Sequence, residues 1–188
     1  WTNWGDFIFS GCDWIEYLYH WDELMISHFA IDCETLKPKS FSNKKSNTLK
    51  MLHAPNHRAT KGTDFIIKSI NKLKKDGYKI DLKIVENKSN QDVIKAIMEA
   101  DIVIDQIIVG WYAMFAIEAM ALEKPVICYL REDFLDLYEY KGLIKKNEFP
   151  IINCNFKNLE KKLIDLINLK KSELYKIGKN SRKFRSEE

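Results

Sequence analysis

The chain has 188 residues, of which 46% are hydrophobic and 30% are charged, so it can bury one core of ordinary size but not two. Its net charge of +3 comes from 30 basic and 27 acidic side chains spread along the sequence, which does not indicate a nucleic-acid-binding protein. No apolar run approaches the roughly 20 residues of a membrane span. We therefore expect one complete domain accompanied by a smaller segment.

The first part of the chain has short apolar stretches and no regular alternation. Residues 6–10 predict a short strand, residues 14–19 an aromatic-rich helix or turn, and residues 24–30 a further apolar segment. A stretch of low hydrophobicity, residues 37–47, has the composition of a linker. We expect residues 1–46 to be the end of an N-terminal domain with an interdomain linker, and residues 47–188 to be a complete second domain.

From residue 48 onward, apolar runs alternate with amphipathic segments. The predicted strands are 48–54, 80–85, 101–108, 126–130 and 151–154; the predicted helices are 62–75, 90–100, 113–122 and one or two within 158–185, with Gly178 expected to interrupt the second. Strands joined by helices predict an α/β fold with a Rossmann-like, doubly wound parallel sheet. Ligands of such sheets bind at the carboxyl ends of the strands.

Several common site motifs are missing. The four cysteines lie far apart without a Cys-x-x-Cys pair, which argues against a zinc site or a disulfide framework and favours a reduced, cytoplasmic protein. There is no Gly-x-Gly-x-x-Gly after the first strand and no Gly-x-x-x-x-Gly-Lys-Ser/Thr, so an NAD site and a nucleoside triphosphatase are disfavoured. No Asp-x-Asp occurs, and we expect no metal.

The most informative stretch runs from Phe115 to Leu130. Here Glu118 opens the sequence Glu-Ala-Met-Ala-Leu-Glu-Lys-Pro-Val-Ile, a helix that leads directly into an apolar strand. This arrangement places one carboxylate beside a sheet edge, where an ionised carboxylate can accept hydrogen bonds from two ribose hydroxyls. The alternative is that Glu118 only belongs to a packed helix.

These residues, with the linker, the first strand and Lys61-Gly62, resemble the C-terminal half of group 1 (family 4-like) glycosyltransferases. The resemblance covers most of the chain and implies a GT-B fold, in which two Rossmann-like domains face each other across the active site. The C-terminal domain of such enzymes holds the nucleotide sugar. The resemblance therefore implies that this chain is the donor-binding half with a remnant of the N-terminal domain.

The family's signature is a pair of glutamates seven residues apart, and only half of it is present. Glu118 matches the second glutamate, which implies contact with the nucleotide ribose, whereas Gly110 stands at the place of the first. Tyr112 and Ala113 replace an aromatic residue and a glycine. The helix that begins there would still direct amide groups and its positive dipole end at a diphosphate.

The loop after the first strand carries the second element of the resemblance. Lys61 matches the family's lysine, and Asn56 occupies the place of its arginine. Either Arg58 supplies the second positive charge, or Lys61 and backbone amides hold the diphosphate. A preorganised cation there would stabilise the charge that develops on a nucleoside diphosphate leaving group.

Three further polar residues have two interpretations each. Asp105 and Gln106 interrupt an apolar strand, and either line the donor cleft or satisfy neighbouring loop amides. His53 ends the first strand, where a hydrogen-bonded structural histidine is commoner than a catalytic one.

The resemblance implies a retaining glycosyltransferase of polysaccharide biosynthesis that moves a sugar from a nucleoside diphosphate to a carbohydrate or lipid-linked acceptor, with catalysis by Lys61, Arg58 and Glu118 and no metal. We expect this chain to be inactive as an isolated fragment. The alternative is a catalytically silent nucleotide-sugar-binding or regulatory module. Exposed aromatic residues near the start suggest a homodimer, and a Lys-rich face suggests peripheral contact with the inner face of the membrane. The residues of that face are Lys161, Lys162, Lys170 and Lys171.

Overall fold

The computed structural model describes residues 4–11, 15–25, 30–39 and 48–187. The chain forms two compact units: Ile31–Leu130 with Pro150–Glu188, and Trp1–Ala30 with Arg131–Phe149. Residues 131–149 therefore group with the first 30 residues, although they lie within the range that the sequence assigns to the second domain. The functional assignment of the two parts stays a prediction.

The larger unit is built on a parallel sheet with the order β4-β3-β5-β6-β7. Its strands are β3 (Leu49–His53), β4 (Ile80–Ile84), β5 (Ile102–Ile104), β6 (Val126–Cys128) and β7 (Ile152–Asn153). The chain passes from β3 to β4 on one side and then returns to β5 on the other. This confirms the doubly wound α/β class, and it places the topological switch point between β3 and β5.

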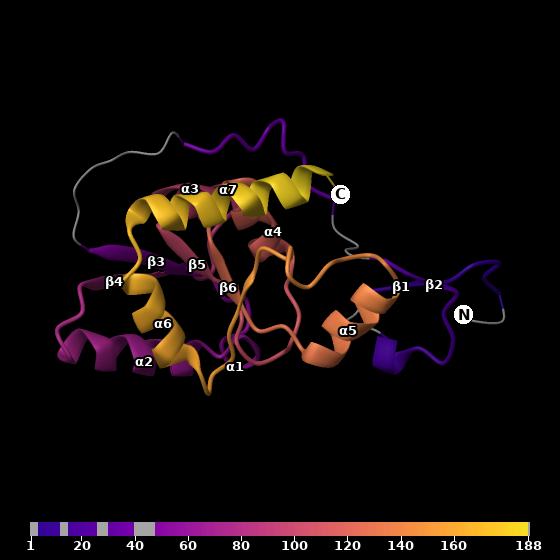
Figure 1. Cartoon of the computed structure of the whole chain (residues 1–188), viewed down its shortest axis with the longest axis horizontal. Coiled ribbons are helices and arrows are strands. Elements are labelled where there is room, and N and C mark those ends of the chain that lie inside the picture. The colour runs from indigo at the N-terminus through magenta and orange to yellow at the C-terminus, as the bar shows by residue number, and fades with distance from the viewer. Residues whose placement is uncertain (1–3, 12–14, 26–29, 40–47, 188) are drawn as a thin grey trace. The chain divides into compact units, whose positions relative to one another are not determined.

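Helices cover both faces of this sheet (Figure 1). One face carries α2 (Thr63–Lys75) and α6 (Leu159–Ile167); the other carries α3 (Asn90–Glu99), α4 (Met114–Ala121) and α7 (Lys171–Glu187). A short helix, α1 (Arg58–Lys61), precedes α2, and Gly62 joins the two in a left-handed conformation at φ 77°. These positions agree with the predicted helices to within a few residues at each end, except that α1 was not anticipated.

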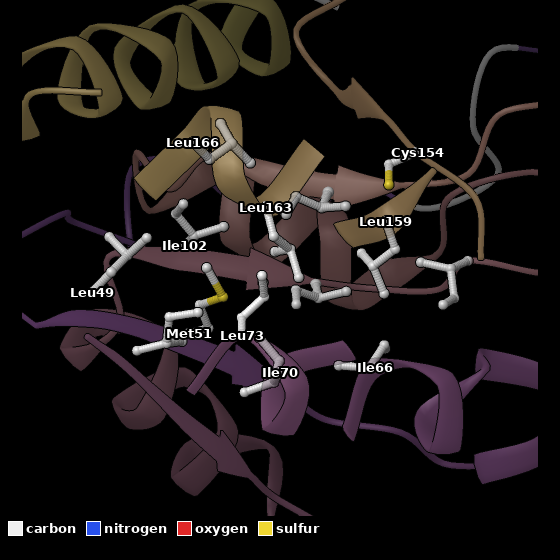
Figure 2. Close-up of a cluster of buried hydrophobic side chains, with 14 of the residues drawn as sticks. Leu49, Met51, Ile66, Ile70, Leu73, Ile102, Cys154, Leu159, Leu163 and Leu166 are labelled. Carbon is white, nitrogen blue, oxygen red and sulfur yellow. The ribbon is translucent and has the colours of Figure 1, made fainter. Parts of the chain in front are cut away.

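The core between α2, α6 and the sheet explains why these segments fold as they do. Ile66, Ile70 and Leu73 repeat at helical spacing on α2. They belong to one buried cluster with Leu159, Leu163 and Leu166 of α6 and with Met51 and Ile102 of the sheet (Figure 2). Burying a side chain of this kind stabilises the fold by about 1.5 to 3 kcal/mol. On the opposite face α4 is buried nearly all round, so its sequence shows no polar stripe.

Two predictions about this unit were wrong. The third strand ends at Ile104 and not at residue 108, because residues 105–110 leave the sheet as a loop. Gly178 does not interrupt a helix, since α7 continues through it. A Cβ at Gly178 would lie 2.0 Å from the backbone oxygen of Glu123. The glycine therefore lets α7 pack closely against the turn after α4.

The smaller unit is poor in regular structure. It contains the parallel pair β1 (Phe9–Ser10) and β2 (Glu23–Leu24), the 3-10 turn η1 (Ile15–Tyr17) and helix α5 (Glu132–Tyr140). Helix α5 has no counterpart among the predicted helices. The Tyr138 hydroxyl donates to the Met25 carbonyl oxygen at 2.7 Å, which ties α5 to the first segment. Trp4 and Tyr19 are 88% and 97% exposed in this unit. Trp1 and Trp14, two more of the aromatic residues near the start of the chain on which the homodimer prediction rests, lie outside the described residues.

Among the helices of the described residues, none is both long enough and apolar enough to cross a membrane.

Candidate functional site

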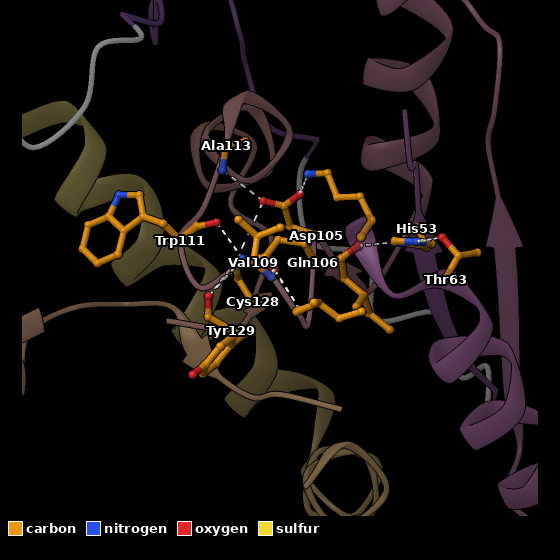
Figure 3. Close-up of polar contacts among 12 residues, drawn as sticks. His53, Thr63, Asp105, Gln106, Val109, Trp111, Ala113, Cys128 and Tyr129 are labelled. Carbon is orange, nitrogen blue, oxygen red and sulfur yellow. Dashed lines mark hydrogen bonds and ion pairs between the residues drawn. The ribbon is translucent and has the colours of Figure 1, made fainter. Parts of the chain in front are cut away.

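The candidate site lies where β3 and β5 end, at the switch point of the sheet. His53 is the last residue of β3 and is fully buried. Its Nδ1 lies 2.8 Å from the Ile104 carbonyl oxygen and its Nε2 lies 2.9 Å from the Thr63 hydroxyl (Figure 3). Burial lowers the pKa of His53, so the ring is neutral, donates from Nδ1 and accepts at Nε2. His53 is thus a structural link between β3, β5 and α2.

Asp105 follows β5 directly and joins two loops. Its side chain is 0% exposed and forms an ion pair with Lys61 through Oδ1. Its other oxygen, Oδ2, accepts the Ala113 amide at 3.1 Å, at the N-terminus of α4 (Figure 3). The structure thereby brings together three residues that the sequence singled out separately: Lys61, Asp105 and Ala113.

Gln106 fixes the loop between β5 and α4. Its Oε1 accepts the amides of Ile108 and Val109 at 3.0 and 2.7 Å, and its Nε2 donates to the Trp111 carbonyl oxygen at 2.6 Å. Of the two interpretations of Gln106, the structure therefore supports the one in which it satisfies loop groups. Gly110, which stands where the family has a glutamate, is buried and adopts φ 101°. A side chain in that conformation would be strained.

Glu118 lies one turn into α4 and is 8% exposed. Its Oε1 accepts Asn90 Nδ2 at 2.6 Å, from the first residue of α3. Within the part of the chain that the structure describes, no hydrogen bond joins Oε2 to a protein donor. Burial raises the pKa of Glu118, and the Asn90 hydrogen bond opposes that rise. A buried carboxylate with one oxygen left over is the kind of group that a ligand completes.

The remaining predicted residues surround this centre in different ways. Arg58 forms an ion pair with Glu86, in which a single nitrogen, Nη1, donates to both carboxylate oxygens at 2.8 and 3.1 Å, and the Arg58 side chain is partly exposed. Asn56 is exposed in the loop after β3. Tyr112 is buried and stacks on Trp111 with ring centroids 5.2 Å apart.

One residue of the site, Asn90, was missed by sequence reasoning. Asn90 and Glu86 both follow β4, and each holds a residue that the sequence had singled out. A usable signal existed for Asn90: Ser89 caps α3 by accepting the Asp92 amide at 3.2 Å, which places Asn90 at the start of a helix on the ligand-binding edge. Its contact with Glu118 depends on the packing of α3 beside α4.

No group of three or more histidine, cysteine, aspartate or glutamate side chains suited to a metal ion occurs among the described residues.

Comparison with solved structures shows which known fold this chain shares. A structure of Staphylococcus aureus TarM, a mutant in complex with fondaparinux, α-GlcNAc-glycerol and UDP, is similar with a TM-score of 0.63 and 14% identity over 94% of this chain and 38% of TarM. The C-terminal domain of LpcC, a group 1 glycosyl transferase from Francisella tularensis, gives a TM-score of 0.57 and 18% identity over 85% of this chain and 98% of that domain. The chain has the fold of a GT-B C-terminal half.

A third structure extends the likeness to nearly the whole chain. The pneumococcal O-GlcNAc transferase GtfA, in complex with UDP and GlcNAc, matches with a TM-score of 0.52 and 13% identity over 99% of this chain and 42% of GtfA. No family profile matches the sequence, and no curated protein matches it. At these identities the likeness concerns the GT-B fold, and the chain spans well under half the length of TarM and GtfA.

Proposed function

We propose that this chain is the donor-binding half of a glycosyltransferase that transfers a sugar from a nucleoside diphosphate to a carbohydrate or lipid-linked acceptor. The observation that carries the proposal is Glu118, a buried carboxylate at the ligand-binding edge of a GT-B fold, whose second oxygen has no hydrogen-bond donor among the described residues. A vicinal ribose diol has the two hydroxyl donors that such a group can accept. TarM and GtfA, which share the fold, were each solved with UDP.

The diphosphate would lie near Lys61 and the N-terminus of α4. There a cation, the amide dipoles of the helix and the loop after β5 converge on one edge. Arg58 is the second candidate cation, provided that it leaves Glu86. In this proposal the donor is held without a metal, and transfer proceeds with retention. A cytoplasmic location with peripheral contact at the inner membrane face, a role in polysaccharide biosynthesis and a homodimer remain predictions.

A second candidate function is a nucleotide-sugar-binding or regulatory module without catalysis. It is favoured by the partners of the two candidate cations, since Lys61 contacts Asp105 and Arg58 contacts Glu86. Gly110, at the place of the family's first glutamate, also removes a donor-sugar contact. A full-length protein that binds UDP-sugars but transfers none of them to any acceptor in a broad panel would support this candidate.

The test of the donor proposal is calorimetric titration with UDP, GDP and 2′,3′-dideoxy-UDP. Replacing Glu118→Gln should weaken UDP binding about 10- to 100-fold, the effect of losing hydrogen bonds to a charged group. The same substitution should not change the affinity for 2′,3′-dideoxy-UDP, which lacks the ribose hydroxyls. Glu99→Gln, an exposed residue of α3 paired with Lys83, is the matched control and should not alter UDP affinity. Equal UDP affinity in wild type and Glu118→Gln would refute the assignment of Glu118.

A further inference from the structure

One carboxylate occupies both groups to which the proposed function assigns the diphosphate. Asp105 binds the Lys61 ammonium through one oxygen and the Ala113 amide through the other, and its side chain has no exposed surface. The Cys128 thiol lies 4.0 Å from the second oxygen. A charged acceptor at a cation and a helix N-terminus is the arrangement by which proteins bind phosphate. Here the acceptor belongs to the protein.

The charges around this point cancel. Lys61 faces Asp105, Arg58 faces Glu86, and His53 is neutral because burial lowers its pKa. The resting site therefore presents no uncompensated cation to an incoming anion among these groups. An anion has to compete with a carboxylate that is already in place.

The backbone at Lys61 and Gly62 is hydrogen-bonded to and packed against the loop between β5 and α4, so we expect an exchange of partners to involve side chains. The Ile107 amide donates to the Lys61 carbonyl oxygen at 3.2 Å, which joins the segment after β3 to the loop between β5 and α4. A Cβ on Gly62 would lie 2.6 Å from Ile107 Cγ1, so the two loops are in close contact there. The Lys61 side chain, by contrast, has four rotatable bonds and three donors, and it can change its acceptor without moving the loops.

We propose that Asp105 is an internal anion that holds the phosphate-binding groups of the empty site, so that a diphosphate binds only by taking Lys61 and the α4 N-terminus from it. This inference rests on the proposed function for the identity of the ligand. It makes Asp105 a regulator of affinity: the resting protein binds phosphate weakly and selects against anions that cannot displace a carboxylate. It also keeps Lys61 and α4 positioned while the site is empty.

The test uses inorganic pyrophosphate, which has neither ribose nor base. Asp105→Asn keeps the shape of the side chain and an acceptor for Ala113 but removes the charge. It should bind pyrophosphate on the order of tenfold more tightly or better, as expected for removing an opposing unit charge a few Å away. Asp101→Asn is the control, because it changes the net charge equally just before β5, at the opposite end of that strand. It should leave affinity unchanged, and Lys61→Met added to Asp105→Asn should abolish the gain.

A measurement on the unsubstituted chain guards against a variant that fails to fold. Saturating pyrophosphate should shift the ¹⁵N–¹H resonance of Ala113, because that amide changes its acceptor. An unmoved Ala113 resonance at saturation would overturn the inference, as would equal or weaker pyrophosphate binding by a folded Asp105→Asn. A different result would contradict the proposed function alone. If Asp105→Asn binds pyrophosphate more tightly but Glu118→Gln leaves UDP affinity unchanged, the role of Asp105 is supported and the assignment of the nucleotide to Glu118 is refuted.

Discussion

Replacing Glu118 should raise stability while it weakens the proposed nucleotide binding. The carboxylate is 8% exposed and has one hydrogen bond to the described residues, from Asn90 at 2.6 Å. Leaving a polar group of this kind buried without a partner costs about 1 to 3 kcal/mol. Glutamine has nearly the same shape, carries no charge and can still accept from Asn90. We therefore expect Glu118→Gln to raise the free energy of unfolding at pH 7 by about 1 to 2 kcal/mol.

The pH dependence of this gain follows from the sign of the pKa shift. Burial raises the pKa of Glu118 above its ordinary value of 4.5, so the folded state binds a proton more tightly than the unfolded state does. The contribution of Glu118 to stability therefore falls as the pH rises from about 4.5 through the folded pKa. Below that window wild-type Glu118 is protonated in both states. The stability difference between wild type and Glu118→Gln should accordingly be largest at neutral pH and shrink towards pH 4.

Urea unfolding followed by circular dichroism from pH 4 to pH 8 measures this difference directly. Glu99→Gln serves as the control again, since Lys83 lowers the pKa of Glu99 and the residue is exposed, so its replacement should show no gain at neutral pH. A Glu118→Gln variant less stable than wild type at pH 7 would contradict the reasoning. It would mean that the hydrogen bond from Asn90 to the charged Glu118 stabilises the fold and that burial of the carboxylate does not lower the free energy of unfolding.

Two further predictions concern packing. Gly178→Ala should lower the free energy of unfolding by about 1 to 3 kcal/mol, because the added Cβ would lie 2.0 Å from the Glu123 carbonyl oxygen and the contact must open. Replacing the exposed Asn180 of the same helix by alanine is the control and should stabilise the chain slightly. If urea unfolding finds Gly178→Ala more stable than Asn180→Ala, the close contact is contradicted. Gln106→Ala should lower the free energy of unfolding by about 2 to 4 kcal/mol, because it leaves several loop groups without partners. It should also speed hydrogen exchange at the Val109 amide. If that amide is protected as well as in wild type, the loop keeps its conformation without Gln106.

Apolar periodicity along the chain was sufficient to predict the doubly wound sheet. Helices such as α2 and α6 bury one stripe, and strands such as β3 bury nearly every residue, so each element leaves a local signature in the sequence. The order of the elements then restricts the topology, because crossovers between parallel strands are right-handed. The same local signals placed Lys61 and Glu118 at the carboxyl edge of the sheet, before any contact was known.

The partners of those residues were decided by tertiary structure. Lys61 and Asp105 are 44 residues apart, and Asn90 and Glu118 are 28 apart, so no local pattern reports their contact. The early end of β5 reflects the Gln106 hydrogen bonds to loop groups, and the unbroken helix at Gly178 reflects the neighbouring Glu123 carbonyl. The sequence determines which polar and charged groups lie at the carboxyl edge of the sheet. Which of them are already paired depends on the packing that brings distant segments together, and that pairing sets the charge that a ligand meets.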